Sequence, residues 1–301
     1  MQIIKPVTVT DAILTSSTVP ENDHAVWAAG TSYATGAKVI LISTHKVYES
    51  LINSNQNNDP ASDDGTNWLT LGATNRWKAF DQKIADQVVQ QNSINYVFGS
   101  YNSTVTSVAL FNLVGISANI TVTDPTAGQV YNSTISLVDN ENIIDWFTYF
   151  FEEQIQKETI QALDIPPYRN AAVSITVTAA TGTDAKLGQI VFGFLTNIGA
   201  TTYGTSISIE DFSRKETDAF GNFVVVQRAF SQLADFDIQF ATGNARRIQR
   251  TLAALRAVPV VYIGSADTSF GTTIYGFYRR FDLTLETPSL SFGAIEVEGL
   301  T

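Results

Sequence analysis

Apolar and polar residues alternate with a period of two along most of the chain, which is the pattern of half-buried β-strands. The cleanest run is Ala172–Ala179 (AVSITVTA), and Val105–Leu113 contains the apolar stretch SVALFNL. The residues from Asp124 to Gly128 (DPTAG) interrupt the alternation with a strong turn signal. Further strands are expected at Ser93–Phe98, Ala118–Asp124, Gln129–Val138, Lys186–Thr196, Tyr203–Phe212, Val224–Phe230, Ala234–Phe240, Val260–Ile263, Thr273–Phe277, Phe281–Glu286 and Gly293–Leu300. The pattern predicts a mainly β chain made of β-sandwiches.

One segment near the C-terminus has the helical period instead. Ile248, Leu252 and Leu255 recur at i, i+4 and i+7, which predicts a helix over 244–257 with its apolar face on the C-terminal sandwich. Asn244 is a suitable N-cap, and Pro259 would end the helix. Arginines cover the rest of its surface: Arg246, Arg247, Arg250 and Arg256. This basic face is interpreted as a subunit contact, a solvated face or a surface facing DNA.

The aromatic-rich segment Glu141–Glu158 contains WFTYFFE, and we expect a strand there rather than a helix. Glu152 and Glu153 stand beside these aromatics, a setting that suits sugar cleavage. Adjacent residues of a strand point to opposite faces, so the two glutamates cannot act as a catalytic pair.

The first 24 residues begin with the alternating run Ile3–Val9 and end in a linker that contains Pro20. A strand standing alone would be marginally stable. One interpretation is therefore an exposed N-terminal arm that pairs with another subunit or with another domain.

Charge and composition exclude several classes of protein. The chain of 301 residues has a net charge of −11, with only 16% charged residues and no cysteine. An acidic surface argues against sequence-independent binding of nucleic acid from outside. Without cysteine there is no disulfide, no thiolate metal site and no cysteine nucleophile. No stretch has the roughly 18–20 apolar residues of a membrane span, and Met1–Thr10 lacks the apolar run of a signal peptide.

Few residues could support catalysis. His24 and His45 are the two histidines, and His45 is expected to be a solvated turn residue rather than a base. No phosphate-binding, hydrolase or zinc-protease motif occurs. Asp59, Asp63 and Asp64 lack the spacing of a calcium loop, so a solvated polar loop is favoured. We expect no enzymatic activity, no cofactor and no metal.

Three of the four tryptophans lie between Trp27 and Trp77. Two short strands, Lys38–Ser43 and Lys46–Leu51, are expected here, followed by a polar loop, 53–67. This skeleton resembles the small chitin-binding modules of glycosidases and related mini-domains of tailed-phage virion proteins. Such modules carry adjacent exposed aromatics where this chain has Ser50-Leu51-Ile52-Asn53. The candidate glycan-contact residues are Trp27, Tyr33, Tyr48 and Trp68. We favour the interpretation that these four form a small core, with glycan binding as the alternative.

Two further resemblances cover the rest of the chain. The segment NRWKAFD from Asn75, followed by SVALFNL, resembles galactose-binding-like jelly rolls. In the last third, DAFGN, LAALRAVPVVYIG, YGFYRRF and the terminal IEVEGLT resemble tail proteins of tailed bacteriophages. In those proteins a sandwich with one helix packs side by side in rings that continue the tail tube.

These resemblances imply four parts: an arm (1–24), a chitin-binding-like aromatic β module (25–74), a jelly-roll-like β-sandwich (75–199), and a C-terminal β-sandwich braced by one α-helix (200–301). The function they imply is a structural virion protein, a ring-forming tail-tip or baseplate component between the tail tube and the adsorption apparatus. Its partners would be itself and other tail proteins, after assembly in the host cytoplasm. Arg246, Arg247 and Arg250 would contact a subunit, or DNA if the helix lines the tail lumen. The alternatives are a tail protein that binds a host surface glycan or receptor and, less favoured, a glycan hydrolase.

Overall fold

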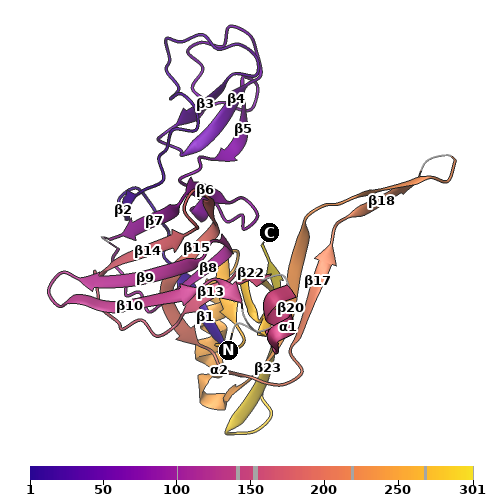
Figure 1. Cartoon of the computed structure of the whole chain (residues 1–301). Helices are drawn as coiled ribbons and strands as arrows, with labels where there is room; N and C mark the ends of the chain where they lie inside the picture. The colour runs from indigo at the N-terminus through magenta and orange to yellow at the C-terminus, as the bar shows by residue number, and fades with distance from the viewer. Residues whose placement is uncertain (100, 140–142, 152–154, 218–219, 268–269, 301) are drawn as a thin grey trace.

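Antiparallel sheets make up most of the molecule (Figure 1). The computed structural model describes residues 1–99, 101–139, 143–151, 155–217, 220–267 and 270–300. The predicted fold class is confirmed: the chain is mainly β, with curled antiparallel sheets of the β-sandwich class. The aromatic module stands at one end of the body, and a long hairpin extends from another side of it.

The largest sheet of the described residues has eleven strands. In spatial order its main path is β13 (Ile160–Ala162), β8 (Ser107–Val114), β15 (Asp184–Asn197), β1 (Gln2–Pro6), β21 (Val260–Ile263), β22 (Thr273–Thr284), β23 (Leu290–Gly299), β20 (Phe230–Ala241) and β16 (Ala200–Thr201). Outside that path, β6 (Val88–Gln91) pairs with β15, and β17 (Ser206–Asp211) pairs with β20. The sheet therefore runs without a break from the part of the chain before residue 199 to the part after it.

The N-terminal segment is an inner strand of this sheet, so it is not exposed, and of the two pairings that the sequence left open it makes the one with other parts of the chain. Gln2 pairs with Asn197 of β15 on one side and with Ile263 of β21 on the other. Ile3 and Ile4 are buried, and each belongs to a different hydrophobic cluster because successive strand residues face opposite ways. The partners of β1 therefore lie in its own chain.

A five-stranded sheet covers the first half of the large sheet and completes a sandwich. Its order is β10 (Gly128–Ser136), β9 (Ser117–Asp124), β14 (Ala172–Thr178), β7 (Ser93–Phe98) and β2 (Leu14–Ser17). Between the two sheets lies the largest cluster of buried apolar side chains. Phe98 of β7 and Phe192 of β15 meet there with ring centroids 4.6 Å apart. The alternation that predicted β14 is the alternation of its buried and half-buried positions.

Helix α2 (Ala245–Ala254) closes the second core, as predicted. Ile248, Leu252 and Leu255 are all buried against strands of the large sheet. Asn244 occupies the N-cap position, but its side chain makes no capping hydrogen bond, because a 3-10 turn, η2 (Thr242–Asn244), leads into the helix. The helix is shorter than the predicted 244–257.

The aromatic module has a sheet of its own, formed by β3 (Lys38–Leu41), β4 (Lys46–Ser50) and β5 (Trp68–Ala73). The first two match the strands expected there. Its core consists of Val39, Tyr48 and Trp68, with Trp27, Tyr33 and Leu41 packed around them. The small core that the sequence favoured is thus present.

The aromatic segment after β11 (Val138–Asp139) and before β12 (Ile155–Gln156) forms a short helix, α1 (Trp146–Phe151). The predicted strand is therefore wrong here. Asp145 accepts a hydrogen bond from the backbone N–H of Thr148 at 2.8 Å, and the Thr148 hydroxyl accepts one from the N–H of Asp145 at 3.1 Å. This reciprocal capping box sets the helix start locally and outweighs the β preference of the aromatics.

The second projection is a long hairpin. Beyond β17 and β20 it continues as β18 (Arg214–Thr217) and β19 (Phe223–Val226), which pair only with each other among the described residues. Figure 1 shows this ribbon extending well away from the body.

Candidate interaction sites

The four candidate glycan-contact residues do not form an open platform. Tyr48 and Trp68 are buried at 4% and 2% exposure, and the Trp68 indole Nε1–H donates to the carbonyl of Asn58 at 2.9 Å. The ring of Tyr33 meets Trp68 edge-on, with centroids 5.4 Å apart. Trp27 and Tyr33 are partly buried. Two of the four rings therefore lack the free face that stacking on a sugar requires.

The polar loop of the module uses its carboxylates for its own structure. Asp63 accepts hydrogen bonds from the backbone N–H groups of Gly65, Asn67 and Trp68. Burial acts to raise the pKa of Asp63, but the Asn67 side chain and these backbone donors hold it below its ordinary value. Within the described ranges, no group of three or more His, Asp or Glu side chains is placed to hold a metal ion.

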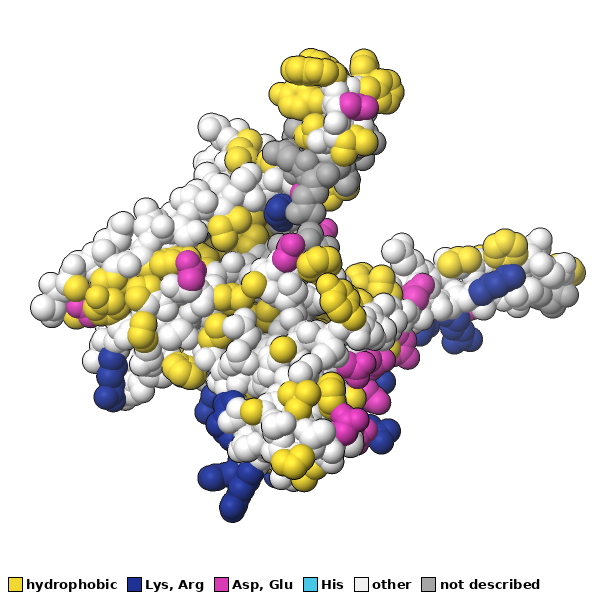
Figure 2. Space-filling view, turned by 90° about the horizontal axis from the view of Figure 1, so that it is seen from below, with side chains coloured by type: hydrophobic (Ala, Val, Ile, Leu, Met, Phe, Trp, Pro, Cys, Tyr) yellow, Lys and Arg dark blue, Asp and Glu magenta, His cyan; other side chains and the backbone are white. Residues whose placement is uncertain are grey.

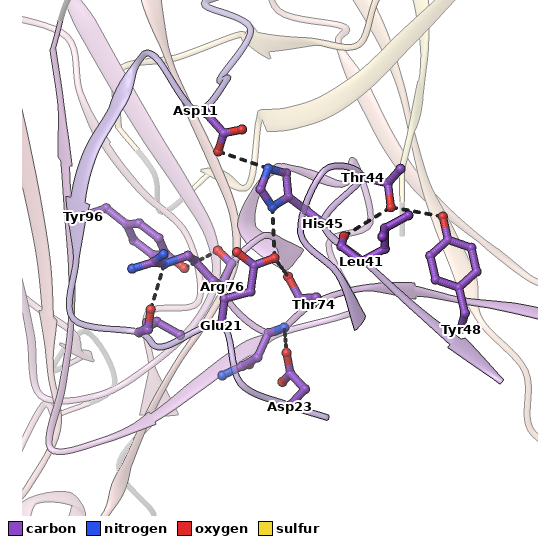
Figure 3. Close-up of polar contacts among 12 residues, drawn as sticks. Asp11, Glu21, Asp23, Leu41, Thr44, His45, Tyr48, Thr74, Arg76 and Tyr96 are labelled. Carbon is purple, nitrogen blue, oxygen red and sulfur yellow. Dashed lines mark hydrogen bonds and ion pairs between the residues drawn. The ribbon is translucent and has the colours of Figure 1, made fainter. Parts of the chain in front are cut away.

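His45 lies at the junction between the module and the body, and it is not a solvated residue (Figure 3). It occupies the β3–β4 turn with a φ of 54°. Its Nδ1 lies 2.9 Å from Glu21 Oε1, and its Nε2 lies 3.1 Å from Asp11 Oδ1. Its ring also stacks on the indole of Trp77. The sequence prediction missed these partners because they lie in three separate segments of the chain.

The junction continues through hydrogen bonds on both sides of His45 (Figure 3). Glu21 also accepts from the Thr74 hydroxyl at 2.9 Å. The Arg76 Nε–H donates to the carbonyl of Val19 at 2.8 Å, and the Tyr96 hydroxyl donates to the carbonyl of Arg76 at 2.7 Å. Trp77 precedes the short 3-10 turn η1 (Lys78–Phe80). This network fixes the module to the sandwich.

Helix α1 exposes almost every side chain that it carries. Its aromatic residues are all exposed: Trp146 77%, Phe147 67%, Tyr149 55%, Phe150 67% and Phe151 75%. The rings of Trp146 and Phe150 stack at 6.2 Å, and those of Phe147 and Phe151 lie 5.0 Å apart. Figure 2 shows a cluster of apolar side chains at the end of the uppermost projection from the body. Glu152 and Glu153, considered above as glycosidase carboxylates, lie outside the described residues.

The hairpin also presents apolar side chains to solvent. Phe223, Val224 and Val225 of β19 are 61–65% exposed, and Ile209 of β17 is 67% exposed. Lys215 of β18 lies 4.4 Å from the centre of the Phe223 ring. In the described chain no other strand pairs with β18 or β19, and β18 (RKET) carries no large apolar residue, so the apolar side chains of β19 stay largely exposed.

The arginines of α2 surround an open depression bounded by Arg246, Arg247, Arg250 and Thr251. The Arg247 guanidinium donates to the carbonyl of Asn197 at 3.1 Å. Arg246, Arg247 and Arg250 form no ion pair with a described residue, although the chain is strongly acidic. Figure 2, seen from the side on which α2 lies in Figure 1, shows basic side chains projecting from this end.

The chain matches no protein-family model, and no curated protein is significantly similar to it in sequence. Within the part of the chain that the structure describes, no helix is both long enough and apolar enough to cross a lipid bilayer.

Proposed function

We propose that this chain is a structural protein of a bacteriophage tail, a component that assembles with copies of itself into a ring at the tail tip or baseplate. In this role it connects the tail tube to the adsorption apparatus, within the virion and after assembly in the host cytoplasm. The resemblance of its last third to tail proteins supports the proposal, as does the mainly β architecture.

The observation that carries the proposal is the hairpin from β17 to β20. A two-stranded ribbon is marginally stable in water, and unpaired strand edges attract other strands. Here the ribbon carries the exposed sequence FVVV on β19. Contact with another protein chain would bury these side chains and pair these edges. In a symmetric assembly, each copy supplies one hairpin and receives another.

The test compares the full chain with a variant that lacks the outer hairpin. Asp211 of β17 and Phe230 of β20 are paired residues. Residues 212–229 are therefore replaced by Asn-Gly, a dipeptide that joins paired strands in a tight turn. We expect closed rings of the wild type by electron microscopy and mass photometry. The shortened variant should be a folded monomer with an unchanged circular dichroism spectrum. A wild type that remains monomeric at high concentration would contradict the proposal.

Glycan or receptor binding remains the second candidate, with less support in the module because Tyr48 and Trp68 are buried. Glycan hydrolysis has no arrangement of described carboxylates in its favour. Saturable binding of host surface glycans to the full chain, without ring formation, would favour recognition over assembly.

A further inference from the structure

We propose that α1 of one copy docks against the arginine face of α2 on the neighbouring copy, so that the contact repeats around the ring. The inference rests on the proposed function, because it requires copies of the chain to assemble. It assigns a role to the exposed aromatic residues of α1 and to the arginine face of α2, whose exposure the hairpin contact does not explain.

The first surface is α1, which is built to contact something outside its own chain. Its aromatic rings are among the most exposed large side chains of the described residues, and Ile144 before it is 83% exposed. The capping box between Asp145 and Thr148 stabilises the start of this short helix. Rigid aromatic side chains lose little conformational entropy on binding, so the exposed rings of α1 are well suited to docking.

The charge around α1 selects the kind of partner. Residues 139–157 contain five Asp or Glu and one Lys, Lys157, which lies 4.0 Å from a carboxylate oxygen of Asp139. Hydrogen bonds from the backbone N–H and the side chain of Thr148 hold the pKa of Asp145 below its ordinary value, so this carboxylate is ionised at neutral pH. A carboxylate-rich segment is repelled by anionic lipid and by nucleic acid. Its complement is a protein surface that offers cations.

The chain itself carries such a surface on α2. Residues 242–259 contain four arginines and no Asp or Glu. Arg246, Arg247 and Arg250 stand around the open depression without an ion-pair partner among the described residues. A guanidinium pairs with carboxylates and also stacks on aromatic rings. One arginine face can therefore accept both the aromatic rings and the carboxylate of α1.

The positions of the two surfaces suit contact between copies. In Figure 1, α2 lies at the bottom of the body, and Figure 2 shows the apolar cluster of α1 at the end of a separate projection. A surface and its complement at two different places on one chain make a head-to-tail contact, which closes into a ring when the rotation between copies allows.

Disulfide trapping tests this contact directly, because the chain has no cysteine of its own. Tyr149→Cys places a thiol on α1, and Ala254→Cys places one on an exposed position of α2 without removing an arginine. Under mild oxidation, a mixture of the two variants should give cross-linked dimers, and either variant alone should give few. Ala127→Cys, on the exposed β9–β10 turn, is the matched control and should not cross-link to either variant. Cross-linking of the mixture no greater than with this control would overturn the docking proposal.

Substitutions on the two surfaces give a second readout, the dissociation constant of the ring. It should rise about tenfold or more in the double variant Arg246→Glu/Arg250→Glu. It should rise by a similar factor in the double variant Trp146→Ser/Phe150→Ser. All four side chains are exposed, so folding should be retained. Rings that persist at wild-type stability in both variants would overturn the docking while leaving the ring function standing. A monomeric wild type would overturn both. Binding of wild type, but not of the Trp146/Phe150 variant, to phosphatidylcholine vesicles with no change in ring stability would assign α1 to a membrane instead.

Discussion

The imidazole ring of His45 stacks on the indole ring of Trp77, with centroids 3.8 Å apart and planes inclined by 16°. His45 belongs to the β3–β4 turn of the aromatic module, whereas Trp77 belongs to the segment that enters the sandwich. Glu21, in the linker between β2 and the module, lies against Nδ1, and Asp11, in the segment between β1 and β2, lies against Nε2. One side chain thus connects three segments and sets how the module stands on the body.

His45→Ala is expected to loosen this junction. The change removes the stack and leaves Glu21, whose side chain is only 7% exposed, without its imidazole partner. We expect a loss of about 1–3 kcal/mol in the stability of the module's attachment, the usual range when a buried polar group loses its partner. Hydrogen exchange of residues 19–26 and 74–78 should speed up, whereas exposed Lys46→Ala should leave it unchanged. Equal exchange in wild type and His45→Ala would show that the stack is dispensable.

Leu252→Ala should destabilise the C-terminal half. Leu252 is 1% exposed and packs in the core that α2 shares with the large sheet. Truncation of a buried leucine costs about 2–5 kcal/mol through lost burial and the cavity left behind. The urea midpoint measures the effect. The matched change Gln249→Ala, on the exposed side of the same helix, should alter stability by less than about 0.5 kcal/mol. A Leu252→Ala midpoint equal to that of wild type would mean that α2 does not support the core.

The strands that the sequence predicted well are those whose alternation reflects one buried face, as in β14 and β7. Where a bulge interrupts the alternation, the strand bounds predicted from the sequence are wrong. Thr273–Phe277 and Phe281–Glu286 were expected as two strands, but they belong to one strand, β22, because a bulge between Tyr278 and Arg280 shifts the register. An extra residue in one strand exchanges the inward and outward faces beyond it, so a local pattern shows an interruption.

The position of β1 could not be predicted, because its partners in β15 and β21 are distant in sequence and strand order is set by the whole sheet. One local sign of the pairing between β1 and β15 is Gly193, which the backbone of β1 approaches closely. A Cβ built there would lie 1.9 Å from the carbonyl oxygen of Lys5. A glycine in a buried strand signals the close approach of another backbone, without saying which one. In α1, by contrast, the signal was present in the sequence as Asp145 and Thr148 at capping-box spacing.

Asp81→Asn should stabilise the protein at neutral pH. Asp81 is partly buried, and its Oδ2 has no hydrogen-bond partner in the described chain. Burial raises the pKa of this carboxyl, with a smaller opposing effect from the backbone N–H of Lys83. A raised folded-state pKa means that the folded state holds its proton more tightly than the unfolded state. Stability is therefore lost as pH rises through the interval between the two pKa values, and it stays lower above that interval.

The measurement compares urea midpoints of Asp81→Asn and wild type at several pH values. The variant should be the more stable at pH ~7, and the difference should shrink as wild-type Asp81 is protonated below its ordinary pKa of about 4. Asp184→Asn, at the exposed start of β15, should show no such trend. A pH-independent difference for Asp81→Asn would attribute the effect to packing rather than to charge.

Trp68→Ala separates a structural role of the aromatic module from sugar recognition. Trp68 is 2% exposed, contacts Tyr33, and donates a hydrogen bond to Asn58, so its loss should destabilise the module by roughly 3–5 kcal/mol. The neighbouring change Leu69→Ala, at a position 48% exposed, is the matched control and should have little effect.

Titration of the full chain with chitin oligosaccharides, followed by tryptophan fluorescence, should show no saturable change in wild type. This is expected because stacking on a pyranose ring needs an open aromatic face, and Tyr48 and Trp68 are buried. Saturable binding that Trp27→Ala abolishes in a folded module would instead make Trp27 a sugar contact and favour recognition as the module's role.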